Sequence, residues 1–359
     1  MRYRSEISIG KRNISIHEPT YFIADIASNH DGDLERAKQL IWLCKEAGAD
    51  AVKFQHFKAE KIVSDLGFKN LDGKSSHQAK WKESVFDVFK QYELNRDWNK
   101  ELQQEAKKAS IDFFTTPYDF DAVEEIDSLV EAYKIGSGDI TWTEFIEHVA
   151  KKNKPTLLAT GASNFDDVQR AVKAILKHND AIVLMQCNTN YTGSLENFKY
   201  INLNVLKTYA TMYPNMVLGL SDHTPGHATV LGSIALGARI IEKHFTDDND
   251  RIGPDHPFSM NPQTWAEMVQ KSRELEKALG NGIKVVEKNE VDTVVVQRRG
   301  IYLRNPLEIG QQINIEDLEF LRPAPEGIYE PFDINNVIGS IATCNKEKGE
   351  PLLKGDVEC

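Results

Sequence analysis

Eight short apolar runs in the first 245 residues limit what this chain can fold into more than any other feature. Each run is mostly apolar without strict alternation, which is typical of parallel strands that are buried on both faces. The runs cover residues 21–28, 51–57, 112–118, 132–138, 155–161, 181–188, 216–223 and 239–245. Because helical patterns separate them, the sequence predicts an α/β fold, a (β/α)₈ TIM barrel, with a doubly wound open sheet as the alternative.

The helical segments carry start and stop signals. After the first run, Asp33 can cap a helix whose apolar positions 37, 40, 41 and 44 recur at helical spacing. After the eighth run, Asn261 is a cap, Pro262 takes the first helical position and Gly280 ends the helix. The gap 58–111 is too long for one helix, so we expect an inserted loop followed by two helices.

The two ends of the chain differ from the repeats. Residues 6–17 alternate apolar and polar around a turn, which predicts a short N-terminal hairpin that closes one end of the barrel. After residue 280 the sequence becomes polar, and we expect an extended linker. We divide the chain into a barrel domain with its hairpin (1–285), a linker (286–296) and a small, mostly non-helical C-terminal domain (297–359). At about 60 residues this last domain is marginal alone, so we expect it to dock on another surface.

Acidic residues outnumber basic ones by 54 to 43, which gives a formal net charge of −11. A polyanion is a poor non-specific partner for nucleic acid or an anionic membrane. No apolar stretch is long enough to span a membrane, and the N-terminus is too polar for a signal peptide. The four cysteines, Cys44, Cys187, Cys344 and Cys359, lack metal-site spacing, so we expect a reduced cytoplasmic protein.

Two lysines lie inside apolar runs, Lys53 in the second and Lys134 in the fourth. In such barrels the reactive groups sit at the carboxyl ends of the strands. A lysine there needs a partner that offsets the desolvation of its charge, such as the carboxylate or phosphate of a ligand. Two glycines around Ser137 add backbone N–H groups that can wrap a phosphate. The alternative is a lysine that reaches past the strand end or pairs with a nearby aspartate.

Two histidines end the last two runs. Ser221 and His223 share one strand face, and so do Glu242 and His244. Neighbouring parallel strands lie about 4.8 Å apart, so both imidazoles can share one divalent ion, such as Mn²⁺, Fe²⁺, Co²⁺ or Zn²⁺. Such an ion keeps an open position for a substrate oxygen. The alternative is that each imidazole is hydrogen-bonded within the barrel rim.

Motifs throughout the chain resemble one family. They are Ser-Asn-His-Asp-Gly (28–32), Ala-Gly-Ala-Asp-Ala-Val-Lys-Phe-Gln (47–55), Phe-Thr-Thr-Pro (114–117), Tyr-Lys-Ile-Gly-Ser-Gly-Asp (133–139), Gly-Leu-Ser-Asp-His-Thr (219–224), Ile-Glu-Lys-His-Phe-Thr (241–246), Asp-Arg-Ile-Gly-Pro-Asp (250–255) and Leu-Arg-Pro (321–323). The chain resembles the sialic acid (nonulosonic acid) synthases, which carry a C-terminal SAF (antifreeze-like) domain.

The resemblance implies a phosphoenolpyruvate-dependent transferase that forms a carbon–carbon bond. Such an enzyme joins phosphoenolpyruvate to an open-chain N-acyl amino sugar such as N-acetylmannosamine, adds water and releases phosphate. A legionaminate- or pseudaminate-type synthase that uses a diacetamido-trideoxy sugar is the alternative.

The resemblance also implies roles for individual residues. Those expected to bind phosphoenolpyruvate are Lys53, Thr116, Lys134, Ser137, Thr189 and Ser221. Those expected to face the sugar are Gln55, Asp139, Tyr191, Asp255 and Arg322, of which Arg322 reaches into the partner subunit of a domain-swapped homodimer. His223 and His244 are expected to bind a divalent metal, Mn²⁺ before Mg²⁺ or Co²⁺. Asp25, Lys53 and Lys134 are the expected catalytic residues, with Asp25 handling the proton of a hydroxyl or water.

Four positions depart from the family pattern. Asp25 and Asp139 stand where glutamate is usual, Ala159 replaces a serine and Thr189 replaces an asparagine. They leave the reaction class intact and the acceptor sugar open. A phosphorylated acceptor is disfavoured, because no second cluster of basic residues is reserved for another phosphate. Two other classes stay open, a Schiff-base aldolase with one of the two lysines as nucleophile and a non-catalytic sugar-binding protein.

Overall fold

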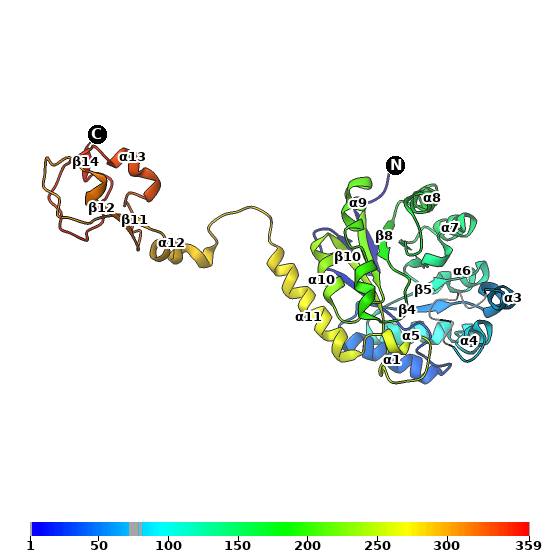
Figure 1. Ribbon diagram of the computed structural model, residues 1–359. Helices are drawn as coiled ribbons and strands as arrows, with labels where there is room; N and C mark the ends of the chain where they lie inside the picture. Colours follow the sequence, from blue (N-terminus) through cyan, green and yellow to red (C-terminus); the bar gives the residue numbers. More distant parts are fainter. Residues whose placement is uncertain (1, 72–77, 79–80, 359) are drawn as a thin grey trace. The chain divides into compact units, whose positions relative to one another are not determined.

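Eight parallel strands form the centre of the first 280 residues. They are β3 (Tyr21–Asp25), β4 (Ala51–His56), β5 (Asp112–Pro117), β6 (Tyr133–Ile135), β7 (Thr156–Ala159), β8 (Ile182–Cys187), β9 (Val217–Asp222) and β10 (Ala238–His244). They close in the order β10-β3-β4-β5-β6-β7-β8-β9, and Figure 1 shows the computed structural model, which describes residues 2–71, 78 and 81–358. The closed barrel confirms the predicted fold and excludes the open doubly wound sheet.

Helices alternate with the strands and cover the outside of the barrel (Figure 1). They are α1 (Leu34–Glu46), α6 (Phe120–Ile126), α7 (Thr143–Ala150), α8 (Phe165–Leu176), α9 (Val205–Met212), α10 (Ala228–Ala235) and α11 (Pro262–Leu279), with 3₁₀ turns η3 (Asp127–Leu129), η4 (Ser137–Asp139), η5 (Leu195–Tyr200) and η6 (His256–Phe258). Asp33 caps α1 by accepting a hydrogen bond from the Arg36 N–H, as the sequence predicts. Asn261 caps α11, and Gly280 ends it.

The segment between β4 and β5 contains the two predicted helices, α4 (Val85–Gln91) and α5 (Asn99–Ala109). The short turn η2 (Arg96–Trp98) precedes α5. The loop predicted ahead of them contains two further helices, α2 (Ala59–Ile62) and α3 (Asp65–Lys69), which are too short for an apolar period to show. Residues 72–77 and 79–80 of that loop lie outside the described residues.

The predicted N-terminal hairpin is present as β1 (Glu6–Ile9) and β2 (Arg12–Ser15), which pair antiparallel. Its isoleucines are buried in the barrel core. Arg12 forms an ion pair with Asp50, the residue just before β4. The hairpin therefore closes the amino end of the barrel and leaves the carboxyl ends of the strands for a site.

The C-terminal unit, Asn281–Cys359, has its own small core. It contains β11 (Gly300–Leu303), β12 (Leu318–Leu321), β13 (Ile341–Ala342), β14 (Val357–Glu358), α13 (Ile334–Val337) and the turns η8 (Ile315–Asp317) and η9 (Pro331–Asp333). The expectation of a wholly extended linker is wrong. The turn η7 (Lys288–Glu290) leads into the helix α12 (Val291–Gln297), and the valines at 291, 294 and 295 give that segment helical apolar spacing.

Three cysteines in the described part of the chain, Cys44, Cys187 and Cys344, are free thiols, and Cys359 lies outside it. None of the described helices combines the length and the apolar character that a membrane crossing requires.

Candidate active site

A cavity opens at the carboxyl ends of the barrel strands and encloses about 1090 Å³ of empty space, its open mouth included. Eleven residues singled out from the sequence line it: Asp25, Lys53, Gln55, Thr116, Lys134, Ser137, Tyr191, Ser221, His223, His244 and Asp255. They come from strands or from the loops that directly follow them. Strand register therefore explains their convergence, because the carboxyl ends of all eight parallel strands meet at one end of the barrel.

Lys53 is held between two neighbouring strands. Asp25 of β3 is its register partner, and the Lys53 Nζ lies 2.6 Å from Asp25 Oδ2. The same Nζ donates a hydrogen bond of 2.9 Å to Thr116 Oγ1 on β5. Both members of the ion pair are about 1% exposed. A buried ammonium with two oxygen partners is fixed in position, and its third N–H remains for a ligand of the cavity that Lys53 lines.

Lys134 reaches across the barrel from β6 to β10 and β9. Its Nζ forms an ion pair with Glu242 and donates a 2.8 Å hydrogen bond to Ser221 Oγ. Glu242 Oε1 also lies 3.8 Å from the Lys53 Nζ, while its Oε2 is buried without a hydrogen-bond partner. Sequence reasoning placed Glu242 on the same face as His244 but assigned it no role, because the contact with Lys134 crosses between strands that are not adjacent.

We call Asp25, Lys53, Thr116, Lys134, Ser221 and Glu242 the polar floor of the cavity. Its two ammonium groups are paired with two carboxylates, as the alternative considered from sequence expected of a lysine beside an acid. Ligand binding by the two lysines stays a prediction. Burial alone would raise the pKa of Asp25, but the adjacent Lys53 ammonium, His244 and Lys134 together outweigh it and lower that pKa to about 2. The floor is therefore ionised but close to neutral in sum.

His223 and His244 lie next to each other, with ring centroids 5.4 Å apart. The Nδ1 of His223 donates a 2.9 Å hydrogen bond to the carbonyl oxygen of Asn188, which leaves its Nε2 lone pair available. Burial, and then the neighbouring His244, lower the pKa of His223 to about 3, so it is a neutral imidazole. His244 Nδ1 is buried without a hydrogen-bond partner.

These two imidazoles fit a metal-binding role, because each has a ring nitrogen that no donor occupies. Among the described residues no group of three or more His, Cys, Asp and Glu side chains is arranged to hold a metal. The other ligands of an ion bound here would be oxygen atoms, from substrate, from water or from the carboxylates of Asp25 and Asp255 beside His244. Such mixed nitrogen and oxygen sets suit first-row divalent metals.

Three of the predicted site residues do not line the cavity. Asp139, at the end of η4, has a buried Oδ2 without a hydrogen-bond partner, and burial raises its pKa to about 6. Thr189 turns its methyl group toward Gly161. A Cβ added to Gly161 would lie 2.5 Å from that methyl group. Arg322 belongs to the C-terminal unit, where its side chain is exposed.

One side of the cavity is apolar, and no role was predicted for its residues from the sequence. This apolar wall is formed by Phe57, Ile62, Trp81, Val88, Phe89 and Tyr92, all from the segment between β4 and α5. The rings of Phe57 and Phe89 lie 5.3 Å apart, and those of Trp81 and Phe89 lie 6.4 Å apart. The spacing of Val88, Phe89 and Tyr92 was a signal for one helix face, but not for which surface that face would meet.

The profile of the NeuB family matches residues 40–284, and that of the SAF domain matches residues 298–358. The chain belongs to the NeuB family. An N,N'-diacetyllegionaminic acid synthase of Legionella pneumophila is 36% identical over 344 residues, 94% of each chain. An N-acetylneuraminate-9-phosphate synthase of Homo sapiens is 29% identical over 94% of this chain and 92% of its own. The family therefore groups synthases of several nonulosonic acids.

A solved structure of a sialic acid synthetase has the same fold. The N-acetylneuraminic acid (sialic acid) synthetase of Leptospira borgpetersenii, in complex with citrate, matches with a TM-score of 0.70 at 27% identity. The match covers 82% of this chain and 96% of that chain. The family and the C-terminal SAF domain expected from the sequence motifs are thus confirmed.

Proposed function

We propose that this member of the NeuB family condenses phosphoenolpyruvate with an open-chain N-acyl amino sugar, adds water and releases phosphate. The observation that carries the proposal is the convergence of Lys53, Lys134, His223 and His244 on one cavity. A binding protein has no need of both pairs. The names of the relatives support the same reaction class.

The polar floor is the proposed site for phosphoenolpyruvate. Lys53 and Lys134 supply charge-assisted hydrogen bonds, and Thr116 and Ser221 supply hydroxyls beside them. Ser137 lines the cavity, and its Oγ accepts a 2.9 Å hydrogen bond from the Gly161 N–H, which holds the hydroxyl beside the proposed anion.

Charge balance supports a metal in this site. The two lysines are already offset by Asp25 and Glu242, so they cannot also neutralise a phosphate and a carboxylate. A divalent metal held by His223 and His244, of which Mn²⁺ is our first choice, would supply positive charge and polarise the aldehyde oxygen of the acceptor.

In the proposed reaction, C3 of phosphoenolpyruvate attacks the aldehyde carbon of the sugar, and C2 develops oxocarbenium character. Water adds at C2, and the C2–O bond to phosphate then breaks, so phosphate leaves with the bridging oxygen. Asp25 stays ionised and holds Lys53 against the phosphate. A carboxylate with a pKa of about 2 stores a proton poorly, so its proposed part in proton handling is to accept a hydrogen bond from the water.

The apolar wall supports a diacetamido-trideoxy acceptor over N-acetylmannosamine. A methyl at C6 and an acetyl methyl at C4 each gain about 0.8 kcal/mol when buried against such a wall. A hydroxyl in the same place would lose its water, at a cost of about 1–3 kcal/mol. Among the described residues that line the cavity, only Lys53 and Lys134 are lysine or arginine, which disfavours a second phosphate on the acceptor.

A panel of acceptors tests this proposal. Phosphate release is measured with Mn²⁺ and N-acetylmannosamine, its 6-phosphate, or 2,4-diacetamido-2,4,6-trideoxyhexoses, and the product is identified by mass. We expect kcat/KM at least about 10-fold higher for a trideoxy sugar, the factor that two buried methyl groups supply. A preference for N-acetylmannosamine would overturn the assignment of the acceptor, and no phosphate release with any sugar would overturn the synthase.

The paired lysines disfavour the Schiff-base aldolase. Nucleophilic attack on a ketone needs a neutral amine, whereas Asp25 and Glu242 stabilise both ammonium forms. Borohydride in the presence of pyruvate is therefore expected to leave the protein mass unchanged.

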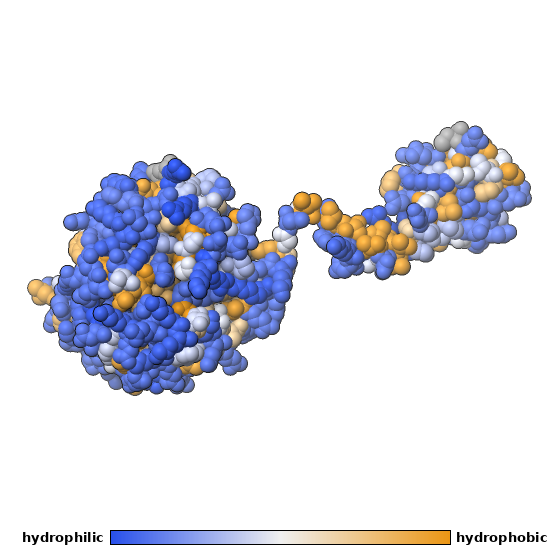
Figure 2. Space-filling model, turned by 180° about the vertical axis from the view of Figure 1, so that it is seen from behind, coloured by the Kyte–Doolittle hydropathy of each residue, from blue (hydrophilic) through white to orange (hydrophobic). Residues whose placement is uncertain are grey.

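The C-terminal unit supports the proposal of a domain-swapped homodimer. Figure 2 shows apolar surface along the segment that joins the two units, and Ile283, Val291 and Val296 are each more than half exposed. Such a strip is suited to burial against a second copy of the chain. If Arg322 completes the partner's cavity, mixed and reassembled Arg322→Ala and Lys53→Ala proteins should regain about a quarter of wild-type activity, since half of the dimers are mixed and each has one intact site. No recovery despite demonstrated subunit exchange would contradict the swap.

A further inference from the structure

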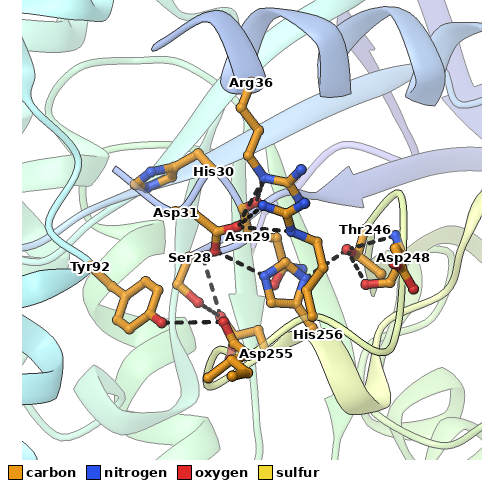
Figure 3. Close-up of polar contacts among 12 residues, drawn as sticks. Ser28, Asn29, His30, Asp31, Arg36, Tyr92, Thr246, Asp248, Asp255 and His256 are labelled. Carbon is orange, nitrogen blue, oxygen red and sulfur yellow. Dashed lines mark hydrogen bonds and ion pairs between the residues drawn. The ribbon is translucent and has the colours of Figure 1, made fainter. Parts of the chain in front are cut away.

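The loop that follows β10 folds back onto the loop that follows β3, beside the cavity mouth (Figure 3). The first of these loops carries Asp255, which lines the cavity and which we propose to contact the acceptor sugar. The inference below rests on that proposed function. It concerns how Asp255 is kept in place.

Asp255 depends on the other loop for its position. It precedes η6 as the cap residue, but its side chain caps no N–H of that turn. Instead its Oδ2 accepts hydrogen bonds from Ser28, at 2.5 Å from Oγ and 3.2 Å from the backbone N–H. A shift between the two loops would therefore move the carboxylate.

His256, the next residue, joins the two loops. Its ring is fully buried, with Nε2 2.9 Å from Asp31 Oδ1 and Nδ1 2.7 Å from Thr246 Oγ1. A carboxylate only accepts hydrogen bonds, so Nε2 carries the proton and donates to Asp31. Gly253 packs on the ring so closely that a Cβ there would lie 2.6 Å from the His256 Cδ2.

Asp31 links the loop after β3 to α1 and to the loop after β10. It pairs with Arg251 of the same loop as His256, at 2.9 Å, and with Arg36 of α1, at 3.1 Å. Arg36 also binds Asp247 with both terminal nitrogens, at 2.7 and 2.6 Å. Asp31 adopts a left-handed backbone with φ of 53°, which is uncommon for a non-glycine residue, and its ion pairs help to hold it there.

We propose that Asp31 and His256 are positioning residues that fix Asp255 toward the acceptor sugar. In the described part of the chain, neither makes a hydrogen bond or ion pair with Lys53 or Lys134. Their effect therefore falls on the acceptor and spares phosphoenolpyruvate.

A kinetic cycle tests this assignment. Asp255→Ala, His256→Ala and the double variant are compared for the KM of both substrates. We expect His256→Ala to raise the acceptor KM about 10-fold and to change the phosphoenolpyruvate KM less than 2-fold. The double variant should be no worse than Asp255→Ala alone, because His256 acts through Asp255. The proposal would be overturned if the effects of the two single substitutions multiplied in the double variant. Equal changes in both KM values of His256→Ala would overturn it as well.

Two further variants keep the test informative if His256→Ala folds poorly. His256→Gln retains an N–H donor for Asp31 and should restore most of the acceptor KM, whereas His256→Leu should not. His148→Ala is the matched control, because that histidine pairs with Glu124 at 2.8 Å on the outside of the barrel. It should leave both KM values unchanged.

Hydrogen exchange gives a readout that does not depend on turnover. In His256→Leu, peptides covering 26–33 and 247–260 should lose protection together. The first of them contains the Ser28 amide, which donates a hydrogen bond to Asp255. Peptides of β4 should keep their protection. Unchanged protection in 26–33 would overturn the positioning role of His256 even if no acceptor is turned over. Absence of phosphate release by the wild-type protein, with coupled loss of protection in the variant, would instead count only against the proposed function.

Discussion

The polar floor and the apolar wall of the cavity are built in different ways. The floor consists of strand residues whose partners are set by register, such as Asp25 opposite Lys53 and Ser221 opposite Glu242. The wall comes from short helices and connections between β4 and α5. Because register is rigid and an inserted segment is free to vary, the floor suits the common chemistry of the family and the wall suits the choice of acceptor.

Breaking the floor should have the largest effect. Lys134→Met leaves the Glu242 carboxylate buried without its closest cation. We expect phosphate release to fall about 10³-fold, as for loss of a preorganised charge, and the free energy of unfolding to fall by about 3–5 kcal/mol.

The double variant Lys134→Met/Glu242→Gln separates the two consequences. Denaturant unfolding should recover most of the lost stability, because no unpaired charge remains, while phosphate release stays low. Recovery of activity in the double variant would mean that Lys134 serves only as a structural counter-ion.

Metal removal tests the charge balance of the floor. Chelation should lower phosphate release about 10²-fold or more, and Mn²⁺ should restore it. In His223→Ala, added Mn²⁺ should restore far less, since one of the two imidazoles is gone. Full activity after exhaustive chelation, verified by metal analysis, would contradict the proposed site.

Truncating a side chain of the apolar wall tests whether the wall and the floor serve different substrates. Phe89→Ala should raise the acceptor KM about 10-fold and leave the phosphoenolpyruvate KM unchanged, because in the proposed function only the acceptor contacts this surface. Leu66→Ala is the matched control, since Leu66 lies on the same inserted segment but is 70% exposed and does not line the cavity. A rise in the phosphoenolpyruvate KM would show that the apolar wall also affects phosphoenolpyruvate, which would contradict its assignment to the acceptor.

Asp139 should show the smallest effect on activity, because it does not line the cavity. Burial raises its pKa from 3.8 to about 6, so the folded state binds a proton that the unfolded state has lost. Its contribution to stability therefore falls as pH rises from about 4 to about 6.

Asp139→Asn removes this ionisation. We expect the variant to be more stable than wild type at pH 7, by about 1 kcal/mol after solvent screening, and to lose that part of the pH dependence. Unfolding in urea at pH 4.5 and pH 7 measures both. A stability difference that does not change with pH would contradict the raised pKa.

The sequence predicted the floor better than the wall for a physical reason. Alternation along a strand places Ser221 with His223, and Glu242 with His244, on one face. It could not reveal that Lys134 meets Glu242, because their strands lie on opposite sides of the barrel and only closure brings them together.

The directions of loop side chains were harder still to predict from the sequence. Asp139 and Thr189 follow their strands, but no period fixes the direction of a side chain in a loop, and neither of them lines the cavity. The apolar spacing of Val88, Phe89 and Tyr92 marks one helix face but not the surface that this face meets, so the wall could not be placed from the sequence. The barrel, its N-terminal hairpin and the capped helices followed from local patterns that extend over many residues.

Isotope labelling of the bridging oxygen of phosphoenolpyruvate tests the central claim most directly. With ¹⁸O between C2 and phosphorus, a metal and an N-acyl amino sugar, the account predicts acceptor-dependent release of phosphate that keeps the label. The product mass should equal both substrates plus water minus phosphate. Phosphate without the label, or released at the same rate without a sugar, would contradict the condensation proposed for this cavity.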